Sequence, residues 1–231
     1  MTDLAQSGGR SAIEDRYPPP PRAEALWPAL LCVLAAIGIQ VALPARLTLG
    51  SSRWLLPVLE GALLLGLVIA SPAELEHEHR VRRALALAMT IFVSAANIYS
   101  LAALTHYLLN HNVSNGRELI ISGVLIWLTN VLIFGLWYWE VDRGGPGRRA
   151  AGNDGEPDLL FPQMTAERFA PPGWRPQFID YLYVSLTNAT AFSPTDTMPL
   201  TAGAKSMMGI QALVSLVTLG LIVSRAVNIL H

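Results

Sequence analysis

Long runs of apolar residues, separated by short polar stretches, constrain this chain more than any other feature of its sequence. Five runs extend over residues 26–43, 54–70, 84–108, 119–139 and 207–230. A helix needs about 20 mostly apolar residues to cross the roughly 30 Å hydrocarbon layer of a bilayer, and these runs are close to or above that length. Charged residues make up only 14% of the chain, against about 25% in soluble domains. The sequence therefore predicts a helical membrane protein.

A further segment, residues 174–193, is harder to interpret because it is short. Its apolar part, from Phe178 to Phe192, has 15 residues, which gives about 22 Å of α-helix. That length fits a re-entrant helix, or a short span that borrows its flanks, and we favour the span because the whole segment has 20 residues. We expect an all-α membrane protein: a bundle of six membrane-embedded helices whose fifth helix is short or re-entrant.

The polar stretches divide the chain into four parts. Residues 1–24 are polar and proline-rich, which predicts a disordered cytoplasmic tail. Residues 25–139 form a four-helix transmembrane region that ends in Trp137, Tyr138 and Trp139, an aromatic cluster typical of the membrane interface. Residues 140–173 are rich in glycine and proline and predict a flexible linker, and residues 174–231 form the last helical pair.

The basic residues predict the orientation, because Lys and Arg concentrate in cytoplasmic loops. Six spans with both termini in the cytoplasm leave only Arg46, Arg53, Arg117 and Lys205 outside, against twelve basic residues inside. If the fifth segment instead dips in from the cytoplasm, Lys205 and Arg225 exchange sides and the count stays the same. If the fifth segment dips in from outside and the C-terminus is cytoplasmic, the N-terminus lies outside, with four basic residues inside and twelve outside. We therefore expect a multi-pass protein of the cell membrane with a cytoplasmic N-terminus.

Composition and motifs exclude several classes of function. A net charge of −1 with scattered arginines gives no basic surface for nucleic acid. A single cysteine, Cys32, excludes a disulfide framework, and no histidine pair has the spacing of metal ligands. The chain has no phosphate-binding loop and no hydrolase or metalloprotease motif. We expect no enzyme activity, no cofactor and no metal, and the lipid bilayer is the expected partner.

Several polar residues lie inside the helical segments, where they are costly unless they face other helices. The candidates are Glu60, Asn97, Asn130, Asp180 and Gln211. We favour hydrogen bonding between helices, worth about 0.6–2 kcal/mol per contact, over a pathway that these groups line. Glu60 is the only acid deep in one of the five long runs. Two interpretations of Glu60 are open. In the first, it is protonated or hydrogen-bonded within the bundle and has no role in transport. In the second, it is the proton-coupling group of a transporter.

Residues 183–201, YVSLTNATAFSPTDTMPLT, resemble the pore helix and selectivity filter of tetrameric potassium channels. The matching positions are Tyr183, Ser185, Thr190, Asp196, Pro199 and Thr201. Lys205 then leads into a long apolar helix, as in that family. The resemblance runs from Tyr183 to Leu230, about a fifth of the chain. Together with the fourth helix it implies a helix, pore loop, helix module and a homo-tetramer.

The filter itself departs from the potassium-channel pattern. Those filters coordinate the ion with backbone carbonyls, and their glycines permit the necessary backbone angles. Here Ser193 and Thr195 occupy the glycine positions, and Pro194 occupies the tyrosine position and fixes its own φ near about −65°. A ring of carbonyls is therefore not expected. The side chains that would line or cap a route instead are Asn188, Thr190, Ser193, Thr195 and Asp196.

The whole chain also resembles a class of uncharacterised bacterial multi-pass membrane proteins. The resemblance rests on residues 139–146 (WEVDRGGP), 160–163 (LFPQ) and 191–196 (AFSPTD). It implies no known activity, but it does imply that the turn at 192–196 matters for function.

Three functions remain open from the sequence. The first is a cation channel that uses side-chain oxygens and assembles as a tetramer. The second is a non-conducting membrane protein, such as an accessory subunit, that keeps an ancestral helix arrangement, and we favour it slightly because the filter glycines are lost. The third is a small-solute or proton-coupled transporter that depends on Glu60.

Overall fold

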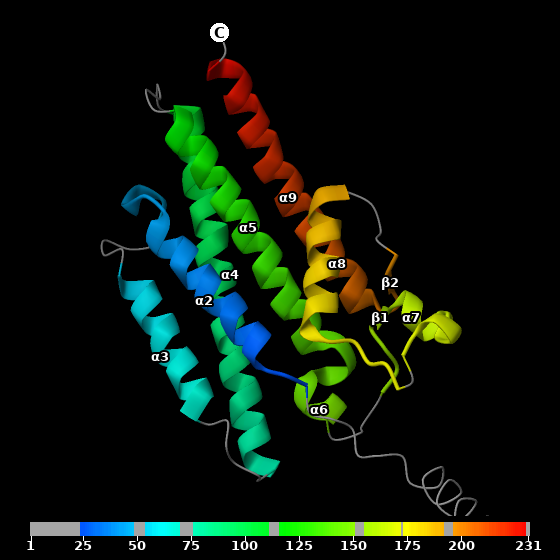
Figure 1. Ribbon diagram of the computed structural model, residues 1–231. Coiled ribbons are helices and arrows are strands. Elements are labelled where there is room, and N and C mark those ends of the chain that lie inside the picture. Colours follow the sequence, from blue (N-terminus) through cyan, green and yellow to red (C-terminus); the bar gives the residue numbers. More distant parts are fainter. Residues whose placement is uncertain are drawn as a thin grey trace, which may run out of the picture.

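A computed structural model of the chain describes residues 24–48, 54–69, 76–110, 116–150, 155–171, 173–191 and 196–229. The fold is mostly helical (Figure 1). The longer helices are α2 (Trp27–Ala42), α3 (Leu55–Ile69), α4 (Glu76–Asn110), α5 (Gly116–Val141), α8 (Phe178–Ala191) and α9 (Ala202–Ile229). The five long apolar runs therefore do form helices, and α8 falls on the ambiguous segment.

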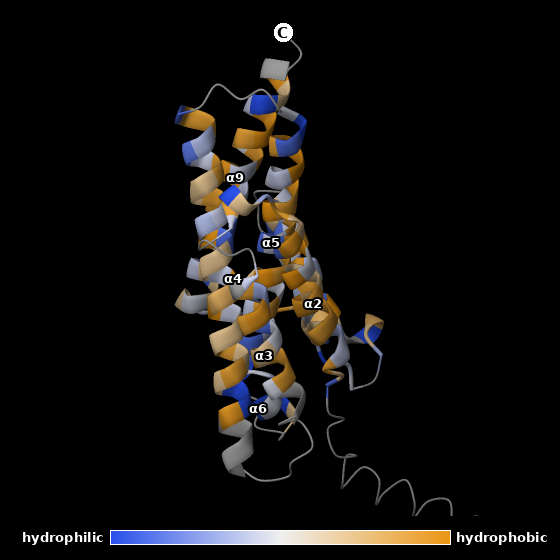
Figure 2. Ribbon diagram, turned by 90° about the vertical axis from the view of Figure 1, so that its left-hand side faces the viewer, coloured by the Kyte–Doolittle hydropathy of each residue, from blue (hydrophilic) through white to orange (hydrophobic). Residues whose placement is uncertain are grey.

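Three of the described helices are long and apolar enough to cross a membrane, over Val81–Asn110, Gly116–Gly144 and Ala202–Val227. Two further helices, Trp27–Ala42 and Leu56–Gly66, are apolar but shorter. Hydrophobic residues cover much of the length of the bundle, and hydrophilic residues lie at its two ends and at some places between them (Figure 2). These features support a membrane protein, whereas six membrane helices remain a prediction.

Helix α5 lies at the centre of the bundle, in contact with α2, α4, α8 and α9 (Figure 1). Its buried side chains include Ile133 and Leu136, which join one hydrophobic core with Val33 of α2, Val93 of α4 and Val184 of α8. Burial on several sides explains why α5 reads as a nearly continuous apolar run rather than as an amphipathic helix. The other elements take their positions from α5.

A basic side chain connects three elements at the end of the bundle where α5 begins. Arg46 follows α2 within η1 (Ala45–Leu47), and its guanidinium lies 2.7 Å from the carboxylate of Glu118 near the start of α5. It also lies 4.8 Å from the ring centroid of Tyr107, near the end of α4. Helix α9 ends at this same end of the bundle (Figure 1).

Short elements occupy the segment between α5 and α8. They are η2 (Asp142–Gly144), α6 (Pro146–Ala150), β1 (Leu159–Leu160), α7 (Pro162–Thr165) and η3 (Glu167–Phe169). Strand β1 pairs antiparallel with β2 (Met198–Pro199), which precedes α9. The sequence predicts a flexible linker over 140–173 and no strand. In the described part of that segment, η2 contacts both α5 and α6, and α7 contacts η3.

Helix α8 does not carry the chain from one end of the bundle to the other. Tyr181, in its first turn, donates a hydrogen bond to Asp142 at the end of α5 (2.7 Å). Thr201, just before α9, donates to Asp158 (2.7 Å), which lies beside the same end of α5. The chain thus enters beside α5 and α9 and returns to the end from which it started (Figure 1). This arrangement fits the re-entrant alternative, and the favoured span stays a prediction.

Candidate functional site

The end of α5 reverses sharply, because three consecutive residues adopt left-handed backbone angles. The φ angles are 52° at Arg143, 78° at Gly144 and 95° at Gly145. Glycine reaches this region without steric cost. A Cβ atom on Gly145 would lie 2.9 Å from the carbonyl oxygen of Glu140, so a larger residue does not fit there. The reversal brings α6 back against the end of α5.

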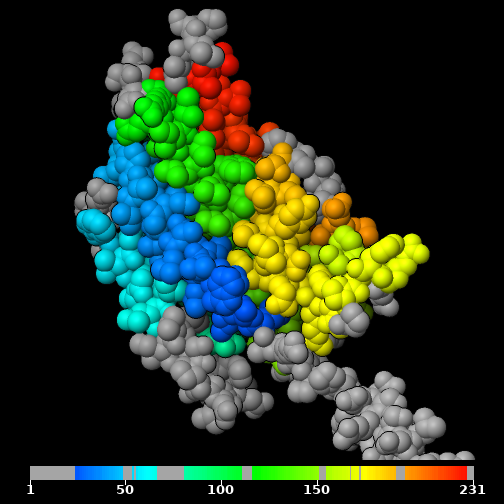
Figure 3. Space-filling model, in the orientation of Figure 1, coloured from blue at the N-terminus to red at the C-terminus, as the bar shows by residue number. Residues whose placement is uncertain are grey.

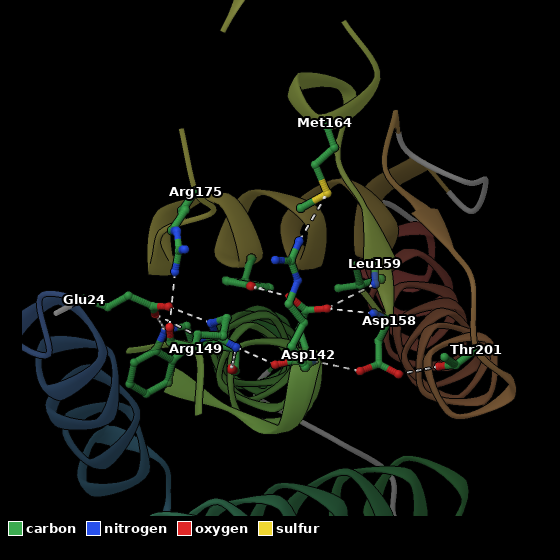
Figure 4. Close-up of polar contacts among 11 residues, drawn as sticks. Glu24, Asp142, Arg149, Asp158, Leu159, Met164, Arg175 and Thr201 are labelled. Atoms are coloured by element: carbon green, nitrogen blue, oxygen red, sulfur yellow. Dashed lines mark hydrogen bonds and ion pairs between the residues drawn. The ribbon is translucent and has the colours of Figure 1, made fainter. Parts of the chain in front are cut away.

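The carboxylate of Asp142 joins three separate segments at this reversal (Figure 4). The residue is 1% exposed. Its Oδ1 accepts the main-chain N–H groups of Asp158 (2.9 Å) and Leu159 (3.3 Å), and its Oδ2 accepts the hydroxyl of Tyr181 (2.7 Å). The guanidinium of Arg143 lies 3.8 Å away and supplies a positive charge. Asp142 therefore fixes β1 and α8 to the end of α5.

Arg149 of α6 covers the carbonyl end of α5. Its Nη1 donates to the carbonyl oxygens of Trp139 (3.0 Å) and Asp142 (2.6 Å). The last carbonyl groups of a helix lack partners within it, so a buried guanidinium is a suitable cap. Its Nε and Nη2 donate to the two carboxylate oxygens of Glu24, at 2.6 and 3.0 Å. Glu24 also accepts the indole N–H of Trp139 (2.7 Å), which ties the start of α2 to this end.

Arg149 is a cation in this setting although it is only 3% exposed. Burial alone lowers the pKa of the guanidinium, but the hydrogen bond with Glu24 and the nearby carboxylates outweigh it and raise the pKa above its ordinary value. Its guanidinium carbon also lies 5.3 Å from the ring centroid of Tyr181, which brings α8 into the same cluster.

Asp158 connects β1 to the start of α9. Its Oδ1 accepts the hydroxyl of Thr201 (2.7 Å), and its Oδ2 accepts the main-chain N–H of Arg143 (3.0 Å). Its main-chain oxygen accepts the N–H of Leu200 (2.8 Å). The Thr201 oxygen in turn accepts the N–H of Ala204 (3.2 Å) and so caps the first turn of α9. The start of α9 is therefore anchored beside the end of α5.

A second polar cluster lies deeper, where α8 packs between α5 and α9. Gln211 of α9 is its centre and is fully buried. The Oε1 atom of Gln211 accepts from the hydroxyl of Tyr138 (2.6 Å) and from the amide of Asn188 (2.8 Å). Its Nε2 donates to the main-chain oxygen (2.9 Å) and the hydroxyl (2.6 Å) of Ser185. Asn188 also donates to the carbonyl oxygen of Met208 (3.0 Å).

This deeper cluster is closed to solvent. Tyr138, Ser185 and Gln211 are 0% exposed and Asn188 is 4% exposed. The hydroxyl of Ser185 donates to the carbonyl oxygen of Val131 (2.6 Å), so the bonds extend to the backbone of α5. The polar atoms therefore point at one another, and they fasten α8 to both of its neighbours.

The residues predicted to line a pore separate into three groups. Asn188 lies in the closed cluster just described. Thr190 is exposed and donates to the main-chain oxygen of Leu186 in its own helix (3.0 Å). Asp196 is also exposed, after the end of α8. Ser193, Pro194 and Thr195 lie outside the described residues.

The other buried polar candidates do not form one site. Asn130 of α5 donates to the hydroxyl of Ser215 in α9 (3.0 Å), close to the closed cluster along both helices. Asn97 is buried on α4, at 5% exposure. Asp180 accepts the main-chain N–H of Gln177 (2.7 Å) and caps the start of α8. Of these three residues, only Asn130 makes the contact between helices that the sequence interpretation predicts.

Glu60 lies apart from both clusters, between α2 and α3. It is 0% exposed, and its Oε1 accepts the amide of Gln40 (3.1 Å). Its Oε2 finds no hydrogen-bond partner among the described residues. Within the described residues, no three His, Cys, Asp or Glu side chains could hold a metal ion together.

Sequence reasoning missed the residues that carry most of these contacts. Tyr138 and Trp139 belong to the aromatic cluster predicted at the membrane interface, but they are only 0% and 5% exposed. Asp142 and Arg149 fall in the predicted linker. The available signal was an acid followed by Arg-Gly-Gly at the end of an apolar run, because glycines there indicate a helix stop with left-handed angles.

No family model, no curated protein and no solved structure matches this chain.

Proposed function

We propose that this protein is a multi-pass integral membrane protein that keeps the helix order of a pore module but does not conduct ions. The proposal rests chiefly on the closed cluster of Tyr138, Ser185, Asn188 and Gln211. Asn188 is the amide that a conducting version would turn towards the ion. Here it donates to Met208 and Gln211 and is 4% exposed.

The physical reason is that a conducting route must offer polar groups to a partly dehydrated ion. In the closed cluster those groups are already paired with one another. Opening the cluster would separate four buried side chains in a medium where water cannot replace their partners. The loss of glycine at positions 193 and 195 argues in the same direction. A membrane scaffold or accessory subunit fits this arrangement better than a channel does.

The proposed topology has five crossings and one re-entrant helix. With the N-terminus in the cytoplasm, α2, α3, α4, α5 and α9 cross, and α8 dips in from the cytoplasmic side. The arginines of the 140–173 segment and Lys205 then lie inside, and Arg225 lies outside. This satisfies the preference of Lys and Arg for cytoplasmic loops. The dip then enters from the side opposite to the one used by potassium channels.

The test is cation flux through the purified protein in sealed vesicles. We expect no potassium or sodium flux from the natural chain, and none from the double variant Ser193→Gly and Thr195→Gly, because the closed cluster remains in both. An added ionophore shows that the vesicles are sealed. Flux through the natural chain would overturn the proposal and favour a cation channel that uses Thr190 and Asp196, both of which are exposed.

A proton-coupled transporter is the second candidate, and Glu60 is the observation that favours it. A buried carboxyl with one unpaired oxygen is costly unless it exchanges a proton or a partner. Proton uptake into vesicles that is driven by a solute gradient, and that is lost in Glu60→Gln, would support this candidate. Solute uptake that is unaffected by Glu60→Gln would exclude Glu60 from the transport step.

A further inference from the structure

An extension projects from the side of the bundle, beside α8 and the start of α9 (Figure 3). We call residues 161–171, 173–175 and 198–200 the lateral extension. It contains α7, η3 and β2 and stands at the level where α5 ends. Neither the closed cluster nor the contacts of Asp142 explain why this segment projects away from the bundle.

Three exposed side chains of the lateral extension are large and apolar. Phe169 is 74% exposed, Met198 is 52% exposed and Leu200 is 46% exposed. Ile179 and Tyr183 on the outer face of α8 are also exposed, at 64% and 56%. In a bundle that crosses a membrane, outward apolar side chains of the helices contact lipid. The apolar surface of the extension continues the lipid-facing surface of α8.

Basic side chains border this apolar surface. The guanidinium carbon of Arg168 lies 4.4 Å from the ring centroid of Phe169, and Lys205 at the start of α9 is exposed. Aromatic and basic side chains side by side are typical of the membrane interface, where the ring reaches the acyl boundary and the cation meets lipid phosphates.

Aromatic contacts attach the lateral extension to α8. Phe161 is 3% exposed and packs edge-on against Tyr181 (5.3 Å between ring centroids) and Trp174 (5.9 Å). Arg143 donates a weak hydrogen bond to the sulfur of Met164 (3.5 Å). These contacts attach the lateral extension on both sides of Phe169, at Phe161 and at Trp174.

We propose that the lateral extension lies on the cytoplasmic leaflet of the membrane that the bundle crosses. Phe169 inserts at the acyl boundary, and Arg168 and Lys205 bind the phosphates of anionic lipids. The extension then sets the depth at which α8 enters the membrane, because Phe161 and Tyr181 join the two. This inference rests on the proposed membrane-spanning function.

The experiment uses the full chain with Cys32→Ser and one new cysteine, labelled with a nitroxide, in vesicles of phosphatidylcholine and phosphatidylglycerol. The three labelled variants are Phe169→Cys, Leu213→Cys and Glu156→Cys. Leu213 is 64% exposed on α9 within a span, and Glu156 is an exposed polar position before β1. Collisions of each label with oxygen, which partitions into lipid, are compared with collisions with a water-soluble nickel chelate.

We expect the labels at 169 and 213 to favour oxygen and the label at 156 to favour the chelate. A label at 169 that behaves like 156, while 213 stays in lipid, would overturn this inference and leave the membrane-spanning function intact. A water-exposed label at 213 would overturn both. Spin–spin broadening at 169 that disappears on dilution with unlabelled protein would show instead that a second copy covers the extension.

The anionic-lipid contact has a separate readout. We expect the label at 169 to lie deeper in vesicles that contain phosphatidylglycerol than in phosphatidylcholine alone. Adding Arg168→Gln should reduce that difference, whereas adding Arg117→Gln, an exposed arginine at the other end of the bundle, should not. Equal depths in the two kinds of vesicle would overturn the assignment of an anionic lipid.

Discussion

Replacing Arg149 with alanine should destabilise the protein more than any change at a neighbouring exposed arginine. The guanidinium makes four hydrogen bonds, two to Glu24 and one each to the carbonyl oxygens of Trp139 and Asp142. The side chains of Arg149 and Glu24 are only 3% and 9% exposed. Removing one partner of a buried ion pair costs about 3–5 kcal/mol, because the other charge remains buried. We therefore expect Arg149→Ala to lower the free energy of unfolding by about that amount.

The assay is equilibrium unfolding of the full chain in detergent micelles, followed by tryptophan fluorescence. The matched control is Arg148→Ala, which removes an exposed arginine from the same helix and should change the unfolding free energy by no more than about 0.5 kcal/mol. A double variant with Glu24→Ala should lose less than the sum of the two single changes, since the residues are in contact. Equal losses for Arg149→Ala and Arg148→Ala would refute this reasoning.

Three further predictions use the same assay. Gln211→Leu should lower the free energy of unfolding by about 1–3 kcal/mol, because hydrogen bonds within a membrane bundle are worth up to about 1.7 kcal/mol each. The control is Ser206→Ala, an exposed change on the same helix that should lower it little. Equal losses for the two variants would contradict a closed cluster. Gly145→Ala should lower the free energy of unfolding by about 1–3 kcal/mol, because the φ angle of Gly145 is 95°. The control is Gly155→Ala, where an added Cβ meets nothing within 4 Å. Similar losses for the two variants would show that the reversal at the end of α5 tolerates a side chain at position 145. Glu60→Gln should change stability by less than about 1 kcal/mol, because the amide oxygen can still accept the hydrogen bond from α2; a large loss would show that an ionised carboxylate is needed.

Hydropathy alone predicted most of the long helices, because a segment that crosses a lipid bilayer must be apolar and must match the thickness of the bilayer. The run at 119–139 became α5 over Gly116–Val141, and the run at 26–43 became α2 over Trp27–Ala42. Helix α4 begins at Glu76, well before the predicted start at 84. The residues in between are mostly charged and favour a helix by propensity, which an apolar window cannot detect.

The clusters at the end of α5 and around Gln211 could not be located from the sequence in the same way. Gln211 and Asn188 were singled out as polar residues in apolar segments, but their partner Tyr138 lies 73 positions from Gln211. Similarly, Glu24 and Arg149 are 125 positions apart. Such pairs depend on how the helices pack against one another, and a single sequence does not specify that packing directly. The density of glycine and proline in 140–173 pointed to flexibility, whereas two of those glycines form the reversal that Arg149 caps.

The side of the membrane on which the two ends of the α8 segment lie tests the account most directly. Single cysteines would replace Glu156, Asp196 and Arg117 in a Cys32→Ser chain, and an impermeant thiol reagent would be added to intact cells and then to opened cells. All three positions are exposed. The account predicts that 156 and 196 react only after the cells are opened, and that 117 reacts in intact cells. Reaction of 156 and 196 from opposite sides would show that residues 178–192 cross the membrane, and would contradict the re-entrant arrangement.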